Sequence, residues 1–343
     1  MMKEFKGFTR GVNLGGWLSQ CDHTEKRYKE FVVEKDIETI KGWGLDHVRV
    51  PVDYELVEDA EGNPKENGFS HIDDVISWCR KYDLNMILDL HRTFGYSFYD
   101  GDQEVGFFDN EGYQERFYRL WEKFAQRYGN LGDMIAFELL NEVTKKEYCE
   151  PWNKIAEECI RRIRKTAPSV KILVGGYYNN SVEAVKDLAM PYDENIVYNF
   201  HCYEPLIFTH QGAPWIPTMD TEYRVSVTDT YKVMAEGSRA MIEQVTTGFD
   251  DYPEDTILNE QYFEDIFAEA VKVADERGVA LYCGEYGVIN RATPEETVAW
   301  YRIIGNVFRK FNIGRAAWNY KEMDFGISDA RLDGVREELI RNL

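Results

Sequence analysis

Residues 134–142 read MIAFELLNE and set the pattern of the whole chain. The stretch is mostly apolar over the length of a strand and turns polar at Asn141 and Glu142. Such runs are typical of buried strands in parallel sheets, whose catalytic groups lie where the strands end. Residues 279–287, VALYCGEYG, repeat this design and stop at Glu285. Two strands that each bring one carboxylate to the same edge provide what glycoside hydrolysis needs.

Strand-length and helix-length segments alternate along all 343 residues. The expected strands are residues 8–14, 45–51, 84–90, 134–142, 171–174, 196–203, 279–285 and 314–319. The expected helices are residues 31–41, 72–82, 114–128, 152–165, 182–188, 262–277, 294–311 and 334–341. This alternation predicts one closed (β/α)8 barrel with the helices outside. We therefore expect residues 1–343 to form a single catalytic domain.

The alternation breaks at residues 206–258, which are polar and contain no clear strand–helix unit. Residues 223–231 show only some β-branched alternation. Long irregular segments inside a compact domain are usually functional. We expect a small subdomain inserted after the sixth strand, covering one side of the cleft. Its candidate for contact with a sugar is Trp215, because aromatic faces suit the apolar faces of pyranose rings.

Composition excludes several classes of protein. The net charge of −21 argues against a nucleic-acid partner, and no stretch is long and apolar enough to span a bilayer. The first ten residues lack the apolar core of a signal peptide. We expect a soluble monomer that is cytoplasmic, or extracellular if a leader has been removed. The six cysteines, scattered without a CxxC motif, predict mostly buried free thiols.

Other polar side chains also lie at strand ends. Arg49 interrupts an apolar run and needs a partner of opposite charge, for which Glu285 is the expected choice. His91 ends the third strand, where a structural role is as plausible as a functional one. Alternation places His201 and Tyr203 on one face of the sixth strand.

Trp17 follows Gly15 and Gly16, which allow the chain to turn tightly after the first strand. The turn could direct Trp17 into the cleft, although plain packing fits equally well.

Four motifs in this order resemble the cellulase family known as glycoside hydrolase family 5. They are Asn141-Glu142, His201-x-Tyr203, Gly284-Glu285-Tyr286-Gly287 and Trp318, each at a strand end. The resemblance covers the chain from end to end, and the insertion resembles that of the clostridial endoglucanase C subgroup. Two residues depart from the family's pattern. Arg92 stands where the family often has histidine, and Val143 where it often has proline. Both changes affect the assignment of subsites and subgroup, and leave the chemistry intact.

The resemblance implies roles for eight residues. These are Glu142 as general acid/base, Glu285 as nucleophile, Asn141 as the ligand of the sugar 2-hydroxyl, Arg49 and Tyr203 as contacts of the nucleophile, His91 and His201 as lining of the subsite before the cleavage point, and Trp318 as its stacking floor. It implies endo-acting hydrolysis of β-1,4-glucan, with mixed-linkage glucan also cut. Mannan, glucomannan and xylan stay open as substrates.

The chemistry requires opposite ionisation of the two carboxyl groups. The acid must hold a proton at the working pH, whereas the nucleophile must be ionised, which Arg49 and the Tyr203 hydroxyl favour. Once the nucleophile is glycosylated its charge vanishes, so that Glu142 can lose its proton and act as a base. One pair then serves both steps with retention. Glu138 is expected to be a buried structural carboxylate with a hydrogen-bonded partner.

Two rival interpretations remain. A metal-dependent barrel hydrolase would use the histidines and glutamates that share this edge, but the first strand offers no His-x-His pair and no HExxH motif occurs. A non-catalytic glycan-binding protein would not require both Glu142 and Glu285. We expect neither a metal ion nor another cofactor.

Overall fold

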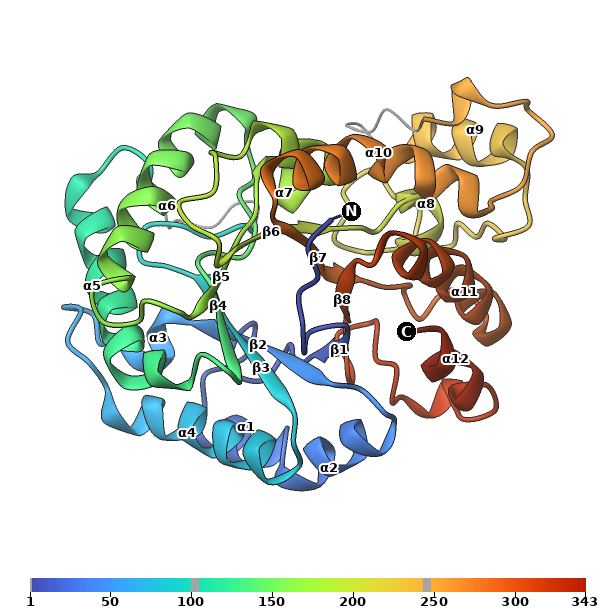
Figure 1. Cartoon of the computed structure of the whole chain (residues 1–343). Coiled ribbons are helices and arrows are strands. Elements are labelled where there is room, and N and C mark those ends of the chain that lie inside the picture. The colour runs from blue at the N-terminus through green and yellow to red at the C-terminus, as the bar shows by residue number, and fades with distance from the viewer. Residues whose placement is uncertain (1, 100–104, 243–247) are drawn as a thin grey trace.

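Eight parallel strands close into a barrel in sequence order. The computed structural model describes residues 2–99, 105–242 and 248–343. The strands are β1 (Arg10–Asn13), β2 (His47–Asp53), β3 (Asn85–Arg92), β4 (Ile135–Glu138), β5 (Lys171–Val174), β6 (Ile196–His201), β7 (Ala280–Tyr286) and β8 (Gly314–Ala317). Because β8 pairs with β1 and helices surround the ring, the expected (β/α)8 barrel is confirmed (Figure 1).

Helices connect the strands on the outside of the ring. They are α1 (Glu25–Glu30), α2 (Glu34–Gly42), α3 (Tyr54–Val57), α4 (Glu66–Lys81), α5 (Glu111–Tyr128), α6 (Cys149–Ile163), α7 (Tyr177–Asn180), α8 (Leu206–Thr209), α9 (Tyr231–Met241), α10 (Glu260–Arg277), α11 (Pro294–Phe311) and α12 (Arg336–Asn342). The 3-10 helices are η1 (Gly129–Leu131), η2 (Lys146–Tyr148), η3 (Val182–Asp187), η4 (Phe249–Asp251) and η5 (Ala330–Leu332). Between β5 and β6, α7 and η3 replace the long helix of the other units.

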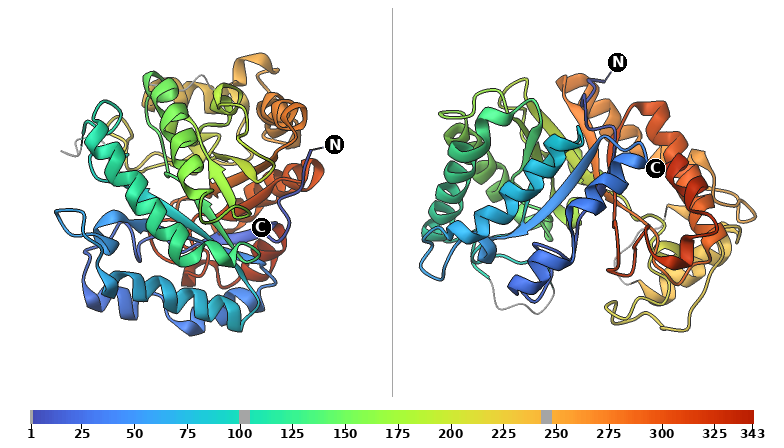
Figure 2. Two further views of the ribbon diagram at one scale, coloured as in Figure 1. Left: turned by 60° about the vertical axis from the view of Figure 1, so that its left-hand side comes forward. Right: turned by 90° about the horizontal axis from the view of Figure 1, so that it is seen from below.

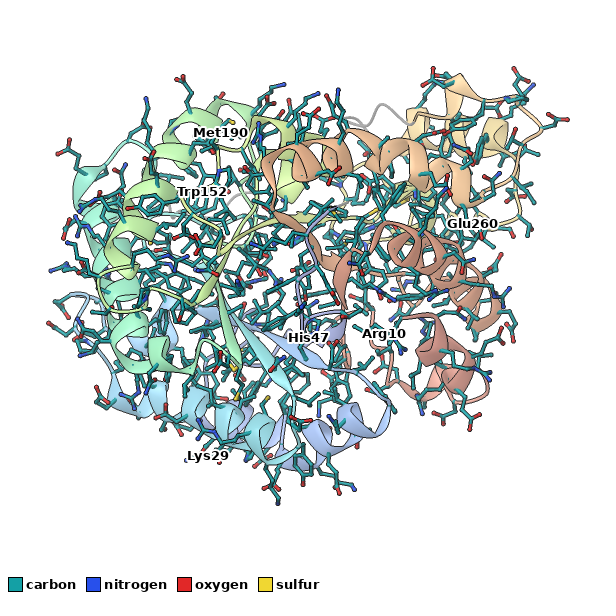
Figure 3. All side chains as sticks on the ribbon, viewed as in Figure 1. Arg10, Lys29, His47, Trp152, Met190 and Glu260 are labelled. Atoms are coloured by element: carbon teal, nitrogen blue, oxygen red, sulfur yellow. The ribbon has the colours of Figure 1, made fainter. Side chains whose placement is uncertain are left out.

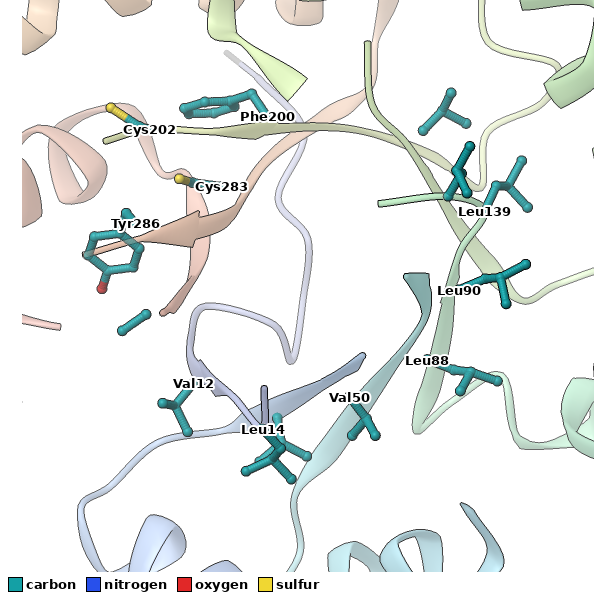
Figure 4. Close-up of a cluster of buried hydrophobic side chains, with 14 of the residues drawn as sticks. Val12, Leu14, Val50, Leu88, Leu90, Leu139, Phe200, Cys202, Cys283 and Tyr286 are labelled. Carbon is teal, nitrogen blue, oxygen red and sulfur yellow. The ribbon is translucent and has the colours of Figure 1, made fainter. Parts of the chain in front are cut away.

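The main core lies between the strands and the helices. Every second residue along the strands belongs to one continuous buried cluster with the helices. Examples are Val12, Val50, Leu88, Phe200 and Cys283. Figure 4 shows these side chains pointing out from the ring of strands. The opposite parity points into the barrel, because successive side chains of a strand alternate in direction.

The inside of the barrel is layered. An apolar floor, closed by Phe5 and Phe8 from the N-terminal segment, contains Ile87, Ala136 and Tyr282. His47, labelled in Figure 3, is buried on this level; its Nε2 lies 2.6 Å from the hydroxyl of Tyr282. Above this floor, towards the carboxyl ends of the strands, the inward residues become polar, and the site is built on that layer.

The segment 206–258 contains more helix than its sequence indicates. It carries α8, α9 and η4. Residues 223–230, which show some β-branched alternation, form no strand beyond a bridge between Thr230 and Ile257, and α9 begins at Tyr231. In the right-hand view of Figure 2 this segment lies on the side of the barrel opposite the N-terminus. Residues 243–247 fall outside the described part of the chain. The division into one domain with an inserted subdomain stays a prediction.

All six cysteines are free thiols, and four of them are buried. None of the helices in the described ranges is long and apolar enough to cross a membrane.

Candidate active site

Arg49 is the centre of the polar layer. It is fully buried on β2, and its guanidinium reaches the carboxylates of Glu138 (2.7 and 2.8 Å), Asp89 (3.0 Å) and Glu285 (2.7 Å). It also donates to the side-chain oxygens of Asn13 and Asn141. Although burial opposes the charge, the carboxylates raise the pKa of Arg49 well above its ordinary value. Side chains from four other strands, or from their ends, are thus tied to one cation on β2.

Glu138 is a buried structural carboxylate in this network. Arg49 binds both of its oxygens, and Asn199 of β6 donates a further hydrogen bond of 2.8 Å. Burial raises the pKa of Glu138 to about 7. Arg49 lies between Glu138 and Glu285. Glu138 on β4 therefore fixes the guanidinium that contacts Glu285 on β7.

A bulge in β7 turns Glu285 into the barrel. Cα positions pair Phe200 with Cys283 and the next residue, His201, with Glu285, so that β7 contains one extra residue at Gly284. Because Tyr282 points inward, strict alternation would direct Gly284 inward and Glu285 outward. The bulge reverses this parity. Gly284 also has to lack a side chain, since a Cβ there would lie 2.8 Å from the Oδ1 of Asn199.

Glu285 is surrounded by donors and positive charge. Arg49 Nη1 donates to Oε1 at 2.7 Å, the hydroxyl of Tyr203 donates to Oε2 at 2.9 Å, and His201 Nδ1 lies 3.7 Å from Oε2. Burial by itself would raise the pKa of Glu285, but the charges of His201 and Arg49 hold it below its ordinary value. Glu285 is therefore ionised at neutral pH and suited to act as a nucleophile.

Glu142 follows β4 and faces different neighbours. His201 Nδ1 lies 2.8 Å from its Oε1, and the side-chain amide of Asn179 donates to its Oε2 at 2.9 Å. Burial opposes a charge on His201, yet Glu285 and Glu142 raise its pKa. One carboxylate oxygen of Glu142 and one of Glu285 lie within 4.8 Å of each other and of a ring nitrogen of His201. The two carboxyl groups thus share His201, whereas Arg49 and Tyr203 contact Glu285 and Asn179 contacts Glu142.

His91 and Trp318 form an aromatic pair beside this site. Their rings are parallel, with centroids 5.9 Å apart, and His91 Nδ1 contacts Asp89 at 2.6 Å. Trp318 follows β8 and packs against the turn after β1. A Cβ on Gly15 would lie only 2.4 Å from the indole, so glycine is needed there for the approach of the ring.

The two other tryptophans that were expected to contact sugar have different positions. Trp215 is 48% exposed and lies near Phe325, which packs against Trp318. Trp17, by contrast, is only 1% exposed; it stacks on Trp78, and its indole N–H donates to a backbone carbonyl. Of the two alternatives for Trp17, contact with sugar is therefore wrong and packing is right, because the ring is buried in the main core.

Within the described residues, two groups of side chains each bring three potential metal ligands within 4.8 Å. One is Glu142, His201 and Glu285, and the other is His23, Asp53 and Glu55. In the first group a cation would face the guanidinium of Arg49. In the second, a hydrogen bond with Asp53 raises the pKa of His23 to about 10, so that its imidazole is protonated rather than free to bind a metal. Neither donor set favours a metal ion, and the expectation of a metal-free site stays a prediction.

Sequence reasoning missed five residues of the site. They are Asn13, Asp89, Asn179 and Asn180, each within hydrogen-bonding distance of a residue expected in the site, and Asn199, which donates to Glu138. Asp89 could have been found from its parity with His91 on β3. Asn179 and Asn180 come shortly after the glycine pair that ends β5, and asparagine is among the few residues besides glycine that adopt left-handed backbone.

The family model for cellulase (glycosyl hydrolase family 5) matches residues 8–324. The chain belongs to glycosyl hydrolase family 5. This family 5 enzyme is 46% identical to Cellodextrinase A of Ruminococcus flavefaciens over 314 residues, which cover 92% of the chain and 86% of that relative. It is 38% identical to Endoglucanase C of Acetivibrio thermocellus over 98% of both chains.

Among solved structures, the Clostridial cellulose synthase subunit Z from Clostridioides difficile aligns with a TM-score of 0.76 and 26% identity, over 98% of this family 5 chain and 99% of that one. Endoglucanase Cel5A of Thermotoga maritima has a TM-score of 0.77 at 23% identity, over 98% and 97%, and supports the fold alone. The resemblance in the motifs is thus confirmed: the chain is an O-glycosyl hydrolase of the cellulase family.

Proposed function

We propose that this enzyme hydrolyses β-1,4-linked glucan, including mixed-linkage glucan, within the polymer and with retention of configuration. The observation that carries the proposal is the pair of carboxyl groups at the ends of β4 and β7. Oxygens of Glu142 and Glu285 lie within 4.8 Å of each other. Retaining enzymes hold the two groups about 5–5.5 Å apart, against roughly 6.5–9.5 Å in inverting ones, and the short spacing supports retention.

In the first step Glu285 attacks the anomeric carbon. A bond forms between a carboxylate oxygen of Glu285 and that carbon as the bond to the glycosidic oxygen breaks, and the departing oxygen takes the proton of Glu142. Arg49 and Tyr203 keep Glu285 ionised before the attack. The result is a glycosyl ester on Glu285 and a free leaving group.

In the second step Glu142 acts as a base. It removes a proton from water, whose oxygen attacks the anomeric carbon and displaces Glu285. Loss of the negative charge on Glu285 in the ester makes this change of role possible. Two inversions at one carbon give net retention.

The remaining site residues would bind the sugar before the cleavage point. Asn141 uses its side-chain oxygen to accept from Arg49, which leaves its NH2 group for the sugar 2-hydroxyl. His91 and His201 would line the same sugar subsite, and Trp318 would stack on the pyranose ring. The exposed indole of Trp215, which belongs to the segment 206–258, would extend this aromatic surface.

Short soluble cellodextrins are the second candidate substrates. The relative with 46% identity is named Cellodextrinase A, whereas the one with 38% identity is named Endoglucanase C. Viscosity loss of carboxymethylcellulose at low release of reducing ends supports endo action on polymer. Release of reducing ends from cello-oligosaccharides with unchanged polymer viscosity would favour the second candidate, and a panel including mannan and xylan would test the other glycans.

Substitution of the pair tests the chemistry. Glu285→Gln should lose nearly all turnover, because no ester can form. Glu142→Ala should be crippled on polymer but keep more activity on an aryl glycoside with a good leaving group, and added azide should give it a β-glycosyl azide product. If neither change lowered turnover by more than about tenfold, against the 10²-fold or more that a catalytic acid–base group usually contributes, the pair would be misassigned.

A further inference from the structure

A left-handed turn follows β5 and lies against the acid/base segment. In α7 three successive residues, Tyr178, Asn179 and Asn180, have φ values of 50°, 56° and 56°. Asparagine tolerates this conformation, but a bulky residue such as tyrosine rarely adopts it. Such backbone persists only where its surroundings fix it, and it is frequent at functional sites.

The surroundings that fix this turn are the residues around Glu142. The backbone N–H of Asn179 donates to the carbonyl of Val143 at 2.9 Å, and the side-chain amide of Asn180 donates to the carbonyl of Asn141 at 2.5 Å. The carbonyls on either side of Glu142 in the sequence therefore both bind the turn. With the backbone held in this way, the side chain of Asn179 reaches Glu142 Oε2 at 2.9 Å.

The two oxygens of Glu142 then have separate donors. His201 occupies Oε1 and Asn179 occupies Oε2, so that the plane of the carboxyl group is set by two neighbours on different strand ends. The Glu142 side chain is 13% exposed, which leaves access for a leaving group.

We propose that Asn179 is a positioning residue that aims Glu142 at the leaving-group oxygen and supports its carboxylate form when it acts as a base. This inference rests on the proposed acid/base role of Glu142. It needs the carboxamide of Asn179, not merely a residue that can form the turn. A hydrogen bond from an N–H group favours an ionised carboxylate, and small errors in the position of a reacting group cost rate steeply.

The variant Asn179→Gly separates the side chain from the backbone. Glycine adopts positive φ readily, so the turn is kept while the amide donor is lost. The matched control is Asn312→Gly: Asn312 is also exposed and left-handed (φ 57°), but it ends α11 away from the site.

The readout is the dependence of kcat/KM on the leaving group. We expect Asn179→Gly to lose about 10- to 100-fold in kcat/KM on cellotetraose, whose leaving group needs a proton. On 2,4-dinitrophenyl β-cellobioside, which needs none, kcat/KM should fall less than about twofold, because kcat/KM reports only the first step there. On the same glycoside kcat should fall, because kcat includes the second step, in which Glu142 acts as the base. Added azide should restore kcat. Asn312→Gly should match the parent on both substrates.

Equal losses of kcat/KM by Asn179→Gly on the two substrates, or no loss on cellotetraose, would overturn the inference. A structural role alone would lower both values together. If the parent enzyme cleaved neither substrate, the proposed function would fail instead, so the two failures are distinguishable.

Discussion

Replacement of Arg49 by methionine should make the stability of the barrel depend steeply on pH. The guanidinium is fully buried and contacts Glu138, Asp89 and Glu285 at 2.7–3.0 Å. Methionine fills much of the arginine stem but carries no charge. Loss of one partner of a buried ion pair costs about 3–5 kcal/mol, a large share of the roughly 5–15 kcal/mol by which a native protein is stable. We expect a loss of that size at pH 7.5.

The loss should shrink as the pH falls. Without the guanidinium, which lowers the pKa of both Glu138 and Glu285, these two carboxylates bind protons more tightly in the folded variant than in the parent, beginning with Glu138, whose pKa burial already raises to about 7. The unfolded chains of both proteins bind the same number of protons. The folded variant therefore gains stability relative to the parent on acidification, by up to about 1.4 kcal/mol per pH unit for each additional proton bound.

Urea denaturation at pH 5.5 and 7.5, followed by tryptophan fluorescence, measures this difference. Arg49→Lys is the control, because lysine keeps the charge and should give a loss that is the same at both values. The reasoning is refuted if Arg49→Met is as stable as the parent at pH 7.5, or if its loss does not change between the two pH values.

Three further predictions concern the surroundings of the pair. Tyr203→Phe removes a hydrogen bond to the charged Glu285 worth about 1.5–3 kcal/mol; kcat should fall roughly 10- to 100-fold while the unfolding transition is kept. Activity should be the same before and after dialysis against EDTA, and a loss that Zn²⁺ or Ca²⁺ restores would favour the metal-dependent alternative. His23, paired with Asp53, has its pKa raised from 6.5 to about 10, so its stabilising effect is full below pH 6.5 and is lost as the pH rises through about 10. The stability difference between parent and His23→Gln should therefore be largest at pH 6 and small at pH 10.5; a constant difference would contradict it.

The parts of the fold that the sequence predicted best have clear local signals. Thr293 and Pro294 begin α11, and the structure shows a capping box with Glu296. β5 is an apolar run closed by two glycines, and its bounds agree with the expected ones. α9 was missed because Gly237 interrupts its helical pattern inside a segment rich in proline and polar residues.

The positions of the site residues depended on features with weak sequence signals. Glu285 points into the barrel only because of the extra residue in β7, and period-two alternation from Tyr282 gives the opposite direction. Trp17 shows the reverse problem: glycines before a tryptophan at a strand end are compatible with both cleft and core. The contact between Asn179 and Glu142 joins two strand ends 37 residues apart, which no local pattern encodes.

The assignment of Glu285 as the nucleophile is tested most directly by trapping the glycosyl ester. A 2-deoxy-2-fluoro-β-cellobioside with a good leaving group forms the ester but hydrolyses slowly, so that the intact enzyme gains the mass of one fluorinated cellobiosyl unit. Proteolysis and tandem mass spectrometry then locate the sugar. We predict one label, on Glu285, and none on the Glu285→Gln variant. An enzyme that turns over β-glucan but gains no label, or carries it on Glu142, would contradict the double displacement proposed for this site.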